Sequence, residues 1–313
     1  MAAGPKTAIV VFAFTRPDHL EALLGSLAQN EEFVDVPVSV RIDGPRNSDE
    51  VALVNAVAEV AARHVGEANV VRSVVNRGLR ESIVGGVSDT LARYEQVIVL
   101  EDDLVVSRYF LRFMFDGLAV YASNSRVASI HGYRLPGAPF GGNIFLRGAD
   151  CWGWATWRDS WSEYRDDAGE LLDELMRSEM TFDYTFGGYS PHLKLLAAAS
   201  SGSSDSWAIR WHTSAYLRNK LTLYPEFSLV KNQGHDGSGT NTPAMSAYDV
   251  AISDRPLSVK QIPVSVSAVG WKAYSKFYRK RKMAKQTKLL ARGITAVREG
   301  TARLSKQATS FFP

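Results

Sequence analysis

The first 120 residues repeat one unit four times: an apolar stretch followed by a segment with helical periodicity. The apolar stretches are rich in β-branched and aromatic side chains, as in TAIVVFAF near the N-terminus. Such alternation predicts parallel strands joined by helices that cover both faces of one sheet. We expect strands at residues 7–14, 36–42, 69–75 and 96–100, and helices at residues 17–29, 48–64, 79–93 and 108–122.

Polar residues follow three of the four predicted strands. Thr15 and Arg16 follow the first strand, Asp43 follows the second, and the Glu-Asp-Asp triplet at 101–103 follows the fourth. In open parallel sheets, ligands bind outside the carboxyl ends of the strands. The sequence therefore predicts one ligand site that contains all of these residues.

The acidic triplet is unusual because it directly follows an apolar strand, VIVL. Strand geometry would place Glu101 and Asp103 on one face and Asp102 on the other. Crowded carboxylates repel one another, and a hard divalent cation would relieve that repulsion. Mg²⁺ and Mn²⁺ accept oxygen ligands and often complete their coordination with phosphate and water. The alternative is a solvated loop whose acids cap a helix.

Several other classes of protein are excluded or disfavoured. The chain has no G-x-G-x-x-G after its first strand, no P-loop and no G-x-S-x-G elbow. Its single cysteine, Cys151, excludes an internal disulfide and a Cys-based zinc site, which suits a reducing compartment. The N-terminal apolar run is only about seven residues long, too short for a signal peptide or a spanning helix. We therefore expect a soluble or peripheral protein.

Short motifs at the predicted strand ends, TRPDHL, IDGP, NRGLR and VIVLEDD, resemble those of nucleotide-sugar-dependent glycosyltransferases of the GT-A type. The similarity is to the inverting group that includes N-acetylglucosaminyltransferase I-like enzymes and bacterial enzymes acting on cell-surface polysaccharides. CWGWATW at 151–157, DSW at 205–207 and NQGHDG at 232–237 resemble later segments of that group. The resemblance covers residues 7–240. It implies a Rossmann-like α/β fold with a nucleotide-sugar-binding half at 1–125 and an acceptor-binding, catalytic half at 126–270.

The resemblance also implies roles for individual residues. Asp103 would bind the metal that holds the donor diphosphate, with His235 touching the metal or a phosphate. Asp102 would approach the donor sugar or the ribose, and Asp43 would hydrogen-bond the uracil or the ribose. Arg16 would contact the nucleotide or its phosphates.

An acceptor hydroxyl must lose its proton as it attacks, so the reaction requires a base. Asp205 is the candidate, because it lies in the segment that resembles the base-bearing motif of the family. The family has two adjacent acids there, and Ser206 replaces one of them in this chain. Asp205 could instead cap the helix that begins beside it. Asp150, Asp166 and Asp167 are the reserve candidates.

Each of the other residues near the predicted site has two possible roles. Thr15 belongs with Arg16 to the nucleotide-binding strand end, although Arg16 could instead pair with helix acids. Arg77 and Arg80 could bind phosphate or brace the start of a helix. The tryptophans of residues 152–157 could stack on sugar rings, but core packing is expected for at least two of the three.

Together these features predict a metal-dependent, inverting glycosyltransferase that uses Mn²⁺ or Mg²⁺. It would move a hexosyl or N-acetylhexosaminyl group from a nucleotide sugar, expected to be UDP-linked, to a saccharide or lipid-linked saccharide in cell-surface polysaccharide synthesis. One alternative is a nucleotidyltransferase that makes sugar nucleotides. It is disfavoured because no Gly-rich, basic phosphate loop lies near the N-terminus. A non-catalytic sugar- or nucleotide-binding module is the other alternative.

Charge is distributed unevenly along the chain. The net charge of +3 divides into +11 for residues 271–313 and −8 for the remainder. Aromatic residues at 271–278 are interleaved with a polybasic run, a composition that suits an anionic membrane surface. One alternative is a helix that packs against the body or binds a partner protein. Contact with nucleic acid is the other alternative, but we do not expect it. The tail is expected to be helical and to hold the protein on the cytoplasmic face of a bacterial membrane. Its apolar residues recur at Met283, Leu290, Val297, Leu304 and Phe311.

Overall fold

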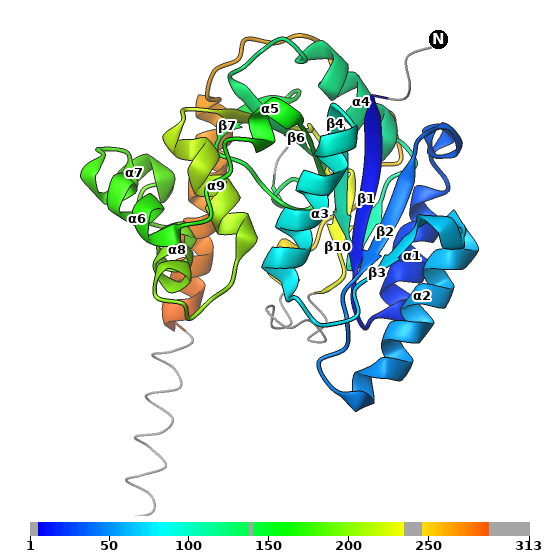
Figure 1. Ribbon diagram of the computed structural model, residues 1–313. Coiled ribbons are helices and arrows are strands. Elements are labelled where there is room, and N and C mark those ends of the chain that lie inside the picture. The colour runs from blue at the N-terminus through cyan, green and yellow to red at the C-terminus, as the bar shows by residue number, and fades with distance from the viewer. Residues whose placement is uncertain (1–5, 138–139, 235–245, 288–313) are drawn as a thin grey trace, which may run out of the picture.

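The computed structural model describes residues 6–137, 140–234 and 246–287. Its main element is an eight-stranded sheet in the order β3-β2-β1-β4-β8-β6-β9-β7, with helices on both faces (Figure 1). A second sheet pairs β10 with β5. The strands are β1 (Thr7–Ala13), β2 (Val38–Ile42), β3 (Val70–Arg72), β4 (Gln96–Glu101), β5 (Leu104–Val106), β6 (Val127–His131), β7 (Ile144–Arg147), β8 (Trp154–Trp157), β9 (Leu221–Tyr224) and β10 (Val230–Asn232).

The helices follow the predicted alternation in the first half of the chain and form a separate group in the second half. They are α1 (Pro17–Leu27), α2 (Val51–Val65), α3 (Leu79–Arg93), α4 (Phe110–Val120), α5 (Arg158–Trp161), α6 (Ala168–Arg177), α7 (Thr181–Tyr184), α8 (His192–Ser200) and α9 (Trp207–Leu217). A further helix covers residues 268–287 and is called the C-terminal helix below. The predicted α/β fold, with a mostly parallel sheet, flanking helices and a C-terminal helix, is confirmed.

Strand β1 lies at the centre of the parallel part of the sheet. Its Val11 is opposite Val40 of β2 on one side and opposite Leu100 of β4 on the other. All seven residues of β1 are buried, which explains why its sequence is apolar throughout rather than alternating. Because β1, β2, β3 and β4 are parallel, their carboxyl ends share one edge of the sheet.

The two faces of the sheet have separate cores. Val11 and its neighbours pack with α1, α2 and α4 on one face. Val10 and Phe12 point to the other face, where they pack with α3 and with the tryptophans of β8, α5 and α9. Because alternate side chains of β1 point to opposite faces of the sheet, this strand contributes to both cores.

The second half of the chain completes the sheet in a less regular way. β8 runs antiparallel to both β4 and β6, and β7 runs antiparallel to β9. Its last two strands, β9 and β10, belong to different sheets and are separated by a segment that begins with Pro225. Proline cannot donate a hydrogen bond to a sheet, so the strand ends before it.

Two local predictions in the first half also need correction. The third strand is confined to Val70–Arg72, shorter than the stretch 69–75 predicted from its apolar residues. The second helix begins at Val51, not at residue 48. The side chain of Asn47 accepts hydrogen bonds from the backbone N–H groups of Asp49 and Glu50, and a short 3₁₀ turn precedes α2.

The C-terminal helix packs against the body of the protein instead of projecting from it. Tyr274 and Tyr278 are buried, with rings 5.7 Å and 5.6 Å from that of Phe186. The ring of Trp271 lies 6.1 Å from the same phenylalanine. These contacts contradict the expectation that the aromatic residues of the tail face a membrane. Predictions for positions 288–313 lie outside the described residues.

No helix within the described part of the chain is both long enough and apolar enough to cross a membrane.

Candidate active site

The acidic triplet lies at the carboxyl edge of the parallel strands, as predicted. Glu101 is the last residue of β4, and Asp102 and Asp103 form the turn that leads into β5. The backbone N–H of Asp102 donates to the carbonyl of Phe12 at 2.9 Å, which fixes the turn beside the end of β1. Asp102 is buried, whereas Glu101 and Asp103 are partly exposed.

Arg16 enters the triplet from the end of β1. Its guanidinium hydrogen-bonds the Asp102 carboxylate and lies 3.4 Å from the nearest Asp103 oxygen. The second Asp102 oxygen accepts the backbone N–H of Phe14 at 3.2 Å. The alternative pairing of Arg16 with acids of the first helix is wrong, since Glu21 pairs with Arg63 and His64 instead.

One guanidinium does not balance three carboxylates in this space. Burial, with repulsion from Asp103 and Asp102, raises the pKa of Glu101 well above its ordinary value, and Arg16 only partly opposes this. Burial likewise raises the pKa of Asp102 to about 6 in spite of its ion pair with Arg16. The described protein groups therefore do not supply enough positive charge to keep all three carboxyls ionised, and a bound cation would supply it.

The chain returns to Asp103 after β10. The carbonyl of Asp103 accepts the backbone N–H of Gln233 at 2.7 Å. A Cβ built on Gly234 would lie 2.5 Å from an Asp103 carboxylate oxygen, so only glycine permits this close approach. His235 is the next residue in sequence and lies outside the described residues, as does any contact it makes with a metal.

A divalent cation fits the donor atoms that the triplet offers. Asp103 is accessible, its side chain 20% exposed, and the charge around it is uncompensated. All the candidate donors are carboxylate oxygens, the ligands that Mg²⁺ and Mn²⁺ prefer. Within the described residues no group of three or more His, Cys, Asp or Glu side chains is arranged to hold a metal by itself. Water and ligand oxygens would have to complete the coordination.

Asp150 joins this edge from the second half of the chain. Because β8 runs antiparallel to β4, with Trp154 opposite Val99, the residues just before β8 lie at the carboxyl edge of β4. Burial raises the pKa of the intervening Cys151, and the charges of Asp150, Glu101 and Asp103 raise it further. Cys151 therefore lies within electrostatic reach of all three acids. Asp150, one of the reserve candidates for the base, therefore belongs to the same site as the triplet.

The surroundings of Asp150 keep it unusually basic for a carboxylate. The Tyr224 hydroxyl donates to it at 3.0 Å, and the side chain is only partly exposed. Burial raises the pKa of Asp150 to about 6, and the hydrogen bond from Tyr224 lowers it by less. A carboxyl with this pKa is half-ionised just below neutral pH and can accept a proton.

Aromatic side chains line the same region. The Trp152 ring lies 4.6 Å from that of Tyr133 and 5.6 Å from that of Tyr248, both in edge-to-face contact. The Trp152 backbone N–H donates to a ring nitrogen of His131 at 3.2 Å, which fixes the strand-entry segment in place. Burial lowers the pKa of His131 to about 3, so the ring is neutral and can accept this hydrogen bond.

Of the three tryptophans considered for sugar stacking, Trp154 is excluded. It is fully buried and packs 5.7 Å from the rings of both Trp161 and Trp207. Trp152 and Trp157 are half-buried and pack against the main core. Core packing is thus confirmed for Trp154, and Trp152 is the one that lies beside Asp150 in sequence.

Asp43 lies at the end of β2, but its oxygens are already in use. One oxygen accepts the backbone N–H groups of Gly44 and Arg77, both at 2.9 Å. The other accepts the backbone N–H of Gly78 at 2.9 Å and the side-chain amide of Asn76 at 3.1 Å. These four bonds shape the turn that begins α3. Asp43 therefore contributes to the site by holding this turn in place.

Arg77 and Thr15 lie at the same edge with exposed or partly exposed side chains. The Arg77 side chain is 57% exposed and 3.8 Å from a Glu81 oxygen. Thr15 is in the bend between β1 and α1. Both could contact a ligand without giving up a buried interaction.

Asp205 lies in a different environment, here called the Arg80 cluster and made up of Arg80, Tyr164, Asp166, Asp205 and Arg210. The Arg80 guanidinium hydrogen-bonds Asp205 at 2.5 Å and also bonds Asp166. Burial tends to raise the pKa of Asp166, but hydrogen bonds from Arg80 and Tyr164 lower it overall. Asp205 does not cap α9, because the Ser206 side chain accepts from Ile209 in that position. The capping alternative for Asp205 is therefore wrong.

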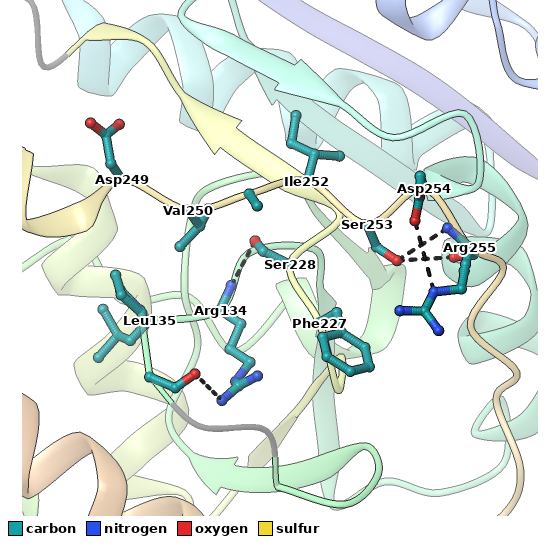
Figure 2. A pocket seen from close by; sticks show the side chains of 13 residues that line it. Arg134, Leu135, Phe227, Ser228, Asp249, Val250, Ile252, Ser253, Asp254 and Arg255 are labelled. Atoms are coloured by element: carbon teal, nitrogen blue, oxygen red, sulfur yellow. Dashed lines mark hydrogen bonds and ion pairs between the residues drawn. The ribbon is translucent and has the colours of Figure 1, made fainter.

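A pocket of about 400 Å³ opens beyond the end of β6, lined by residues 134–137, 227–228 and 249–255 (Figure 2). Its volume is that of a small-ligand site. The Ser228 hydroxyl accepts the Arg134 backbone N–H at 3.1 Å, and Asp254 lies 3.8 Å from Arg255.

No known family model matches the chain, and no curated protein matches its sequence. Among solved structures, the mannosyltransferase PcManGT from Pyrobaculum calidifontis, in complex with GDP-Man and Mn²⁺, is similar with a TM-score of 0.40 at 11% identity over 70% of each chain. TarS 1-349 from S. aureus, in complex with UDP, has a TM-score of 0.39 at 13% identity, over 71% of this chain and 58% of its own.

A third similar structure is glucosyl-3-phosphoglycerate synthase from Mycobacterium tuberculosis, in complex with Mg²⁺ and UDP. Its TM-score is 0.36 at 14% identity, over 65% of this chain and 82% of its own. With TM-scores below 0.5, these likenesses decide nothing about chemistry. Evidence for a reaction has to come from the residues of this chain.

Proposed function

We propose that this protein is a metal-dependent glycosyltransferase of the GT-A type. It transfers a sugar from a nucleotide sugar, a UDP-sugar by the resemblance of its sequence, to a saccharide or lipid-linked saccharide. The observation that carries the proposal is the excess of carboxylates at the carboxyl edge of the parallel strands, where Arg16 is the one cation among the described residues that contacts the triplet. This is the edge at which α/β sheets bind their ligands.

Asp103 would hold a Mn²⁺ or Mg²⁺ ion, with His235 as a second ligand. When bound, the ion would supply a positive charge beside the leaving diphosphate, where negative charge develops. Asp102 is committed to Arg16 and to the backbone of Phe14, so its role is to hold the turn and to face the donor sugar or ribose.

The donor nucleotide would lie along the ends of β1 and β2. Arg16 and Thr15 would face its phosphates or base from the end of β1. Asp43 positions the turn before α3 through its four hydrogen bonds. The exposed guanidinium of Arg77, held at that turn, would reach a phosphate.

In an inverting transfer, the acceptor oxygen bonds to the anomeric carbon while the bond from that carbon to the diphosphate breaks. The acceptor proton must pass to a base as this happens. Asp205 and Asp150 are the two candidates. The carboxylate of Asp205 is already engaged by the guanidinium of Arg80, 2.5 Å away. Asp150 lies beside the triplet, and within the described part of the chain no cation pairs with it, so we favour it.

The acceptor would approach Asp150 past the ring of Trp152. Apolar faces of sugar rings pack well against aromatic side chains, and Trp152 is half-buried and in edge-to-face contact with Tyr133 and Tyr248. A fixed ring next to the base would orient the acceptor hydroxyl for attack.

Product analysis tests the proposal against its alternatives. The protein is incubated with Mn²⁺, a panel of UDP-, GDP- and dTDP-sugars, and a mixture of saccharide acceptors or water. We expect release of a nucleoside diphosphate and loss of that release in Asp103→Asn. Release of pyrophosphate from a nucleoside triphosphate and a sugar phosphate would instead identify a nucleotidyltransferase. Binding of a nucleotide sugar with no turnover under any condition would favour a binding module.

A further inference from the structure

The C-terminal helix has two faces of different character. Its body-facing side includes the buried residues Gly270, Tyr274 and Tyr278. Gly270 allows a close approach to the sheet, because a Cβ there would lie 2.3 Å from a methyl carbon of Ile144. The Ser275 hydroxyl donates to the carbonyl of Phe186 at 3.0 Å. The helix is thus held in one orientation against the protein.

Two basic residues of the C-terminal helix also bind the body. Arg281 lies with its guanidinium 4.2 Å from the centre of the Tyr248 ring. The Lys282 amine donates to the carbonyl of Gly188 at 3.0 Å. These two charges hold the helix to the body and are not part of the outward side.

The outward side is strongly basic. At 100° per residue, Lys272, Lys276, Arg279 and Lys280 lie opposite the buried tyrosines, and all four are exposed. Among the described residues none of the four forms a hydrogen bond or an ion pair, and residues 268–287 contain no acid. Val269 and Met283 share this side and are 62% and 59% exposed. We call these six residues the basic face.

We propose that the basic face docks the protein on the surface of an anionic lipid bilayer. Four unpaired cations that point the same way match a plane of negative charge, and each basic residue near such a surface strengthens binding about fivefold. Exposed Val269 and Met283 at the two ends of the face can enter the boundary between headgroups and acyl chains. In Figure 1 the helix, in orange, runs alongside the layer of α6, α8 and α9.

This docking mode differs from that expected for the tail from its sequence. Trp271, Tyr274 and Tyr278 face the protein and are not available to lipid. Binding is therefore mainly electrostatic and weakens as the salt concentration rises. The proposal does not depend on the reaction proposed above, so either can fail without the other.

Co-sedimentation with vesicles of phosphatidylcholine and phosphatidylglycerol at a 7:3 ratio tests the proposal, using the full chain. The test variant replaces Lys272, Lys276, Arg279 and Lys280 with Gln. A matched control replaces four exposed bases on other elements, Arg93, Arg112, Arg126 and Arg218, with the same residue. Both variants change the net charge equally, and circular dichroism confirms that both are folded.

We expect the partition coefficient of the test variant to fall on the order of several hundredfold and that of the control to fall less than about tenfold. The wild-type protein should not pellet with pure phosphatidylcholine vesicles. Equal loss in the two variants would overturn the proposal, because net charge rather than the basic face would then control binding. Failure of the wild type to pellet with anionic vesicles, with or without binding to RNA or DNA, would also overturn it.

Discussion

Two groups of acids in this molecule have opposite electrostatics. At the carboxyl edge of β4, Glu101, Asp102 and Asp103 share one guanidinium, and burial holds the pKa of Glu101 and Asp102 above ordinary values. In the Arg80 cluster, Asp166 and Asp205 both bond to Arg80, and the pKa of Asp166 is lowered. The described part of the chain does not supply enough positive charge for the first group to ionise fully, whereas the acids of the second group are paired with arginine.

The contrast separates residues that bind or react from residues that hold elements together. An acid with a raised pKa in a partly exposed position can take a cation or a proton, whereas an acid paired with arginine stabilises packing between α3 and the segments near α9. Asp150 belongs with the first group by location and by the direction of its pKa shift. The following predictions test this division, from the largest expected effect to the smallest.

Replacing Asp103 with Asn should have the largest effect. The change removes the accessible carboxylate that would hold the cation, while keeping the shape of the side chain. We expect sugar transfer to fall on the order of a thousandfold or more, because charge on the leaving group loses its stabilisation. Steady-state rates over a range of Mn²⁺ concentrations measure this. Activity within a few fold of wild type would place the cation site elsewhere.

Asp150→Asn should remove the base and leave donor binding intact. General base catalysis contributes on the order of a hundredfold to ten thousandfold, so kcat should fall by about that amount while KM for the donor stays nearly constant. In the wild type, activity should rise with pH around pH 6, where Asp150 ionises. If Asp150→Asn retains both kcat and that rise, Asp150 is not the base.

The same substitution should stabilise the fold above pH 6. Asp150 holds its proton more tightly in the folded protein than in the unfolded chain, so the folded state loses stability as pH rises from about 4 through about 6. Asn cannot ionise, so the variant does not lose stability over this pH range. We expect Asp150→Asn to raise the free energy of unfolding by at most about 3 kcal/mol at pH 7.5, with no gain at pH 4.

Urea denaturation at the two pH values measures the difference. Because burial causes the shift, an equal change at both pH values would show that Asn alters packing or hydrogen bonding with Tyr224 instead of removing a buried charge.

Asp205→Asn should have the smallest effect. Its carboxylate is 59% exposed and paired with Arg80, an arrangement worth about 1 kcal/mol or less, or about a fivefold change in rate if it is lost. The matched change Arg80→Gln should behave similarly. A loss of kcat in Asp205→Asn as large as that in Asp150→Asn would show that the ion pair opens during the reaction and that Asp205 is the base.

Sequence patterns were sufficient for the parallel half of the fold and for the acidic triplet. Strands and helices there alternate with clear apolar periodicity, and the triplet directly follows a buried strand that pairs in parallel with β1. Thus the location of Arg16 and Asp43 at the same edge as Asp103 followed from the rule for parallel sheets.

Sequence patterns could not show which acids of the second half reach the site. The position of Asp150 depends on β8 joining the sheet antiparallel to β4, and its bond to Tyr224 spans 74 residues. The bond from Arg80 to Asp205 spans 125 residues. Neither contact leaves a local signal in the sequence. The burial of the tail aromatics likewise depends on a distant partner, Phe186, that composition cannot reveal.

The central claim is that Asp103 and its surroundings bind a nucleotide sugar together with a divalent cation. Thermal unfolding of the wild type, Asp103→Asn and Asp205→Asn, each with UDP-, GDP- and dTDP-sugars and with or without Mn²⁺, tests it most directly. We predict that one donor class raises the midpoint of the wild type and Asp205→Asn only when Mn²⁺ is present, and that it leaves Asp103→Asn unchanged. Absence of stabilisation by every donor, or equal stabilisation of all three proteins, would contradict the claim.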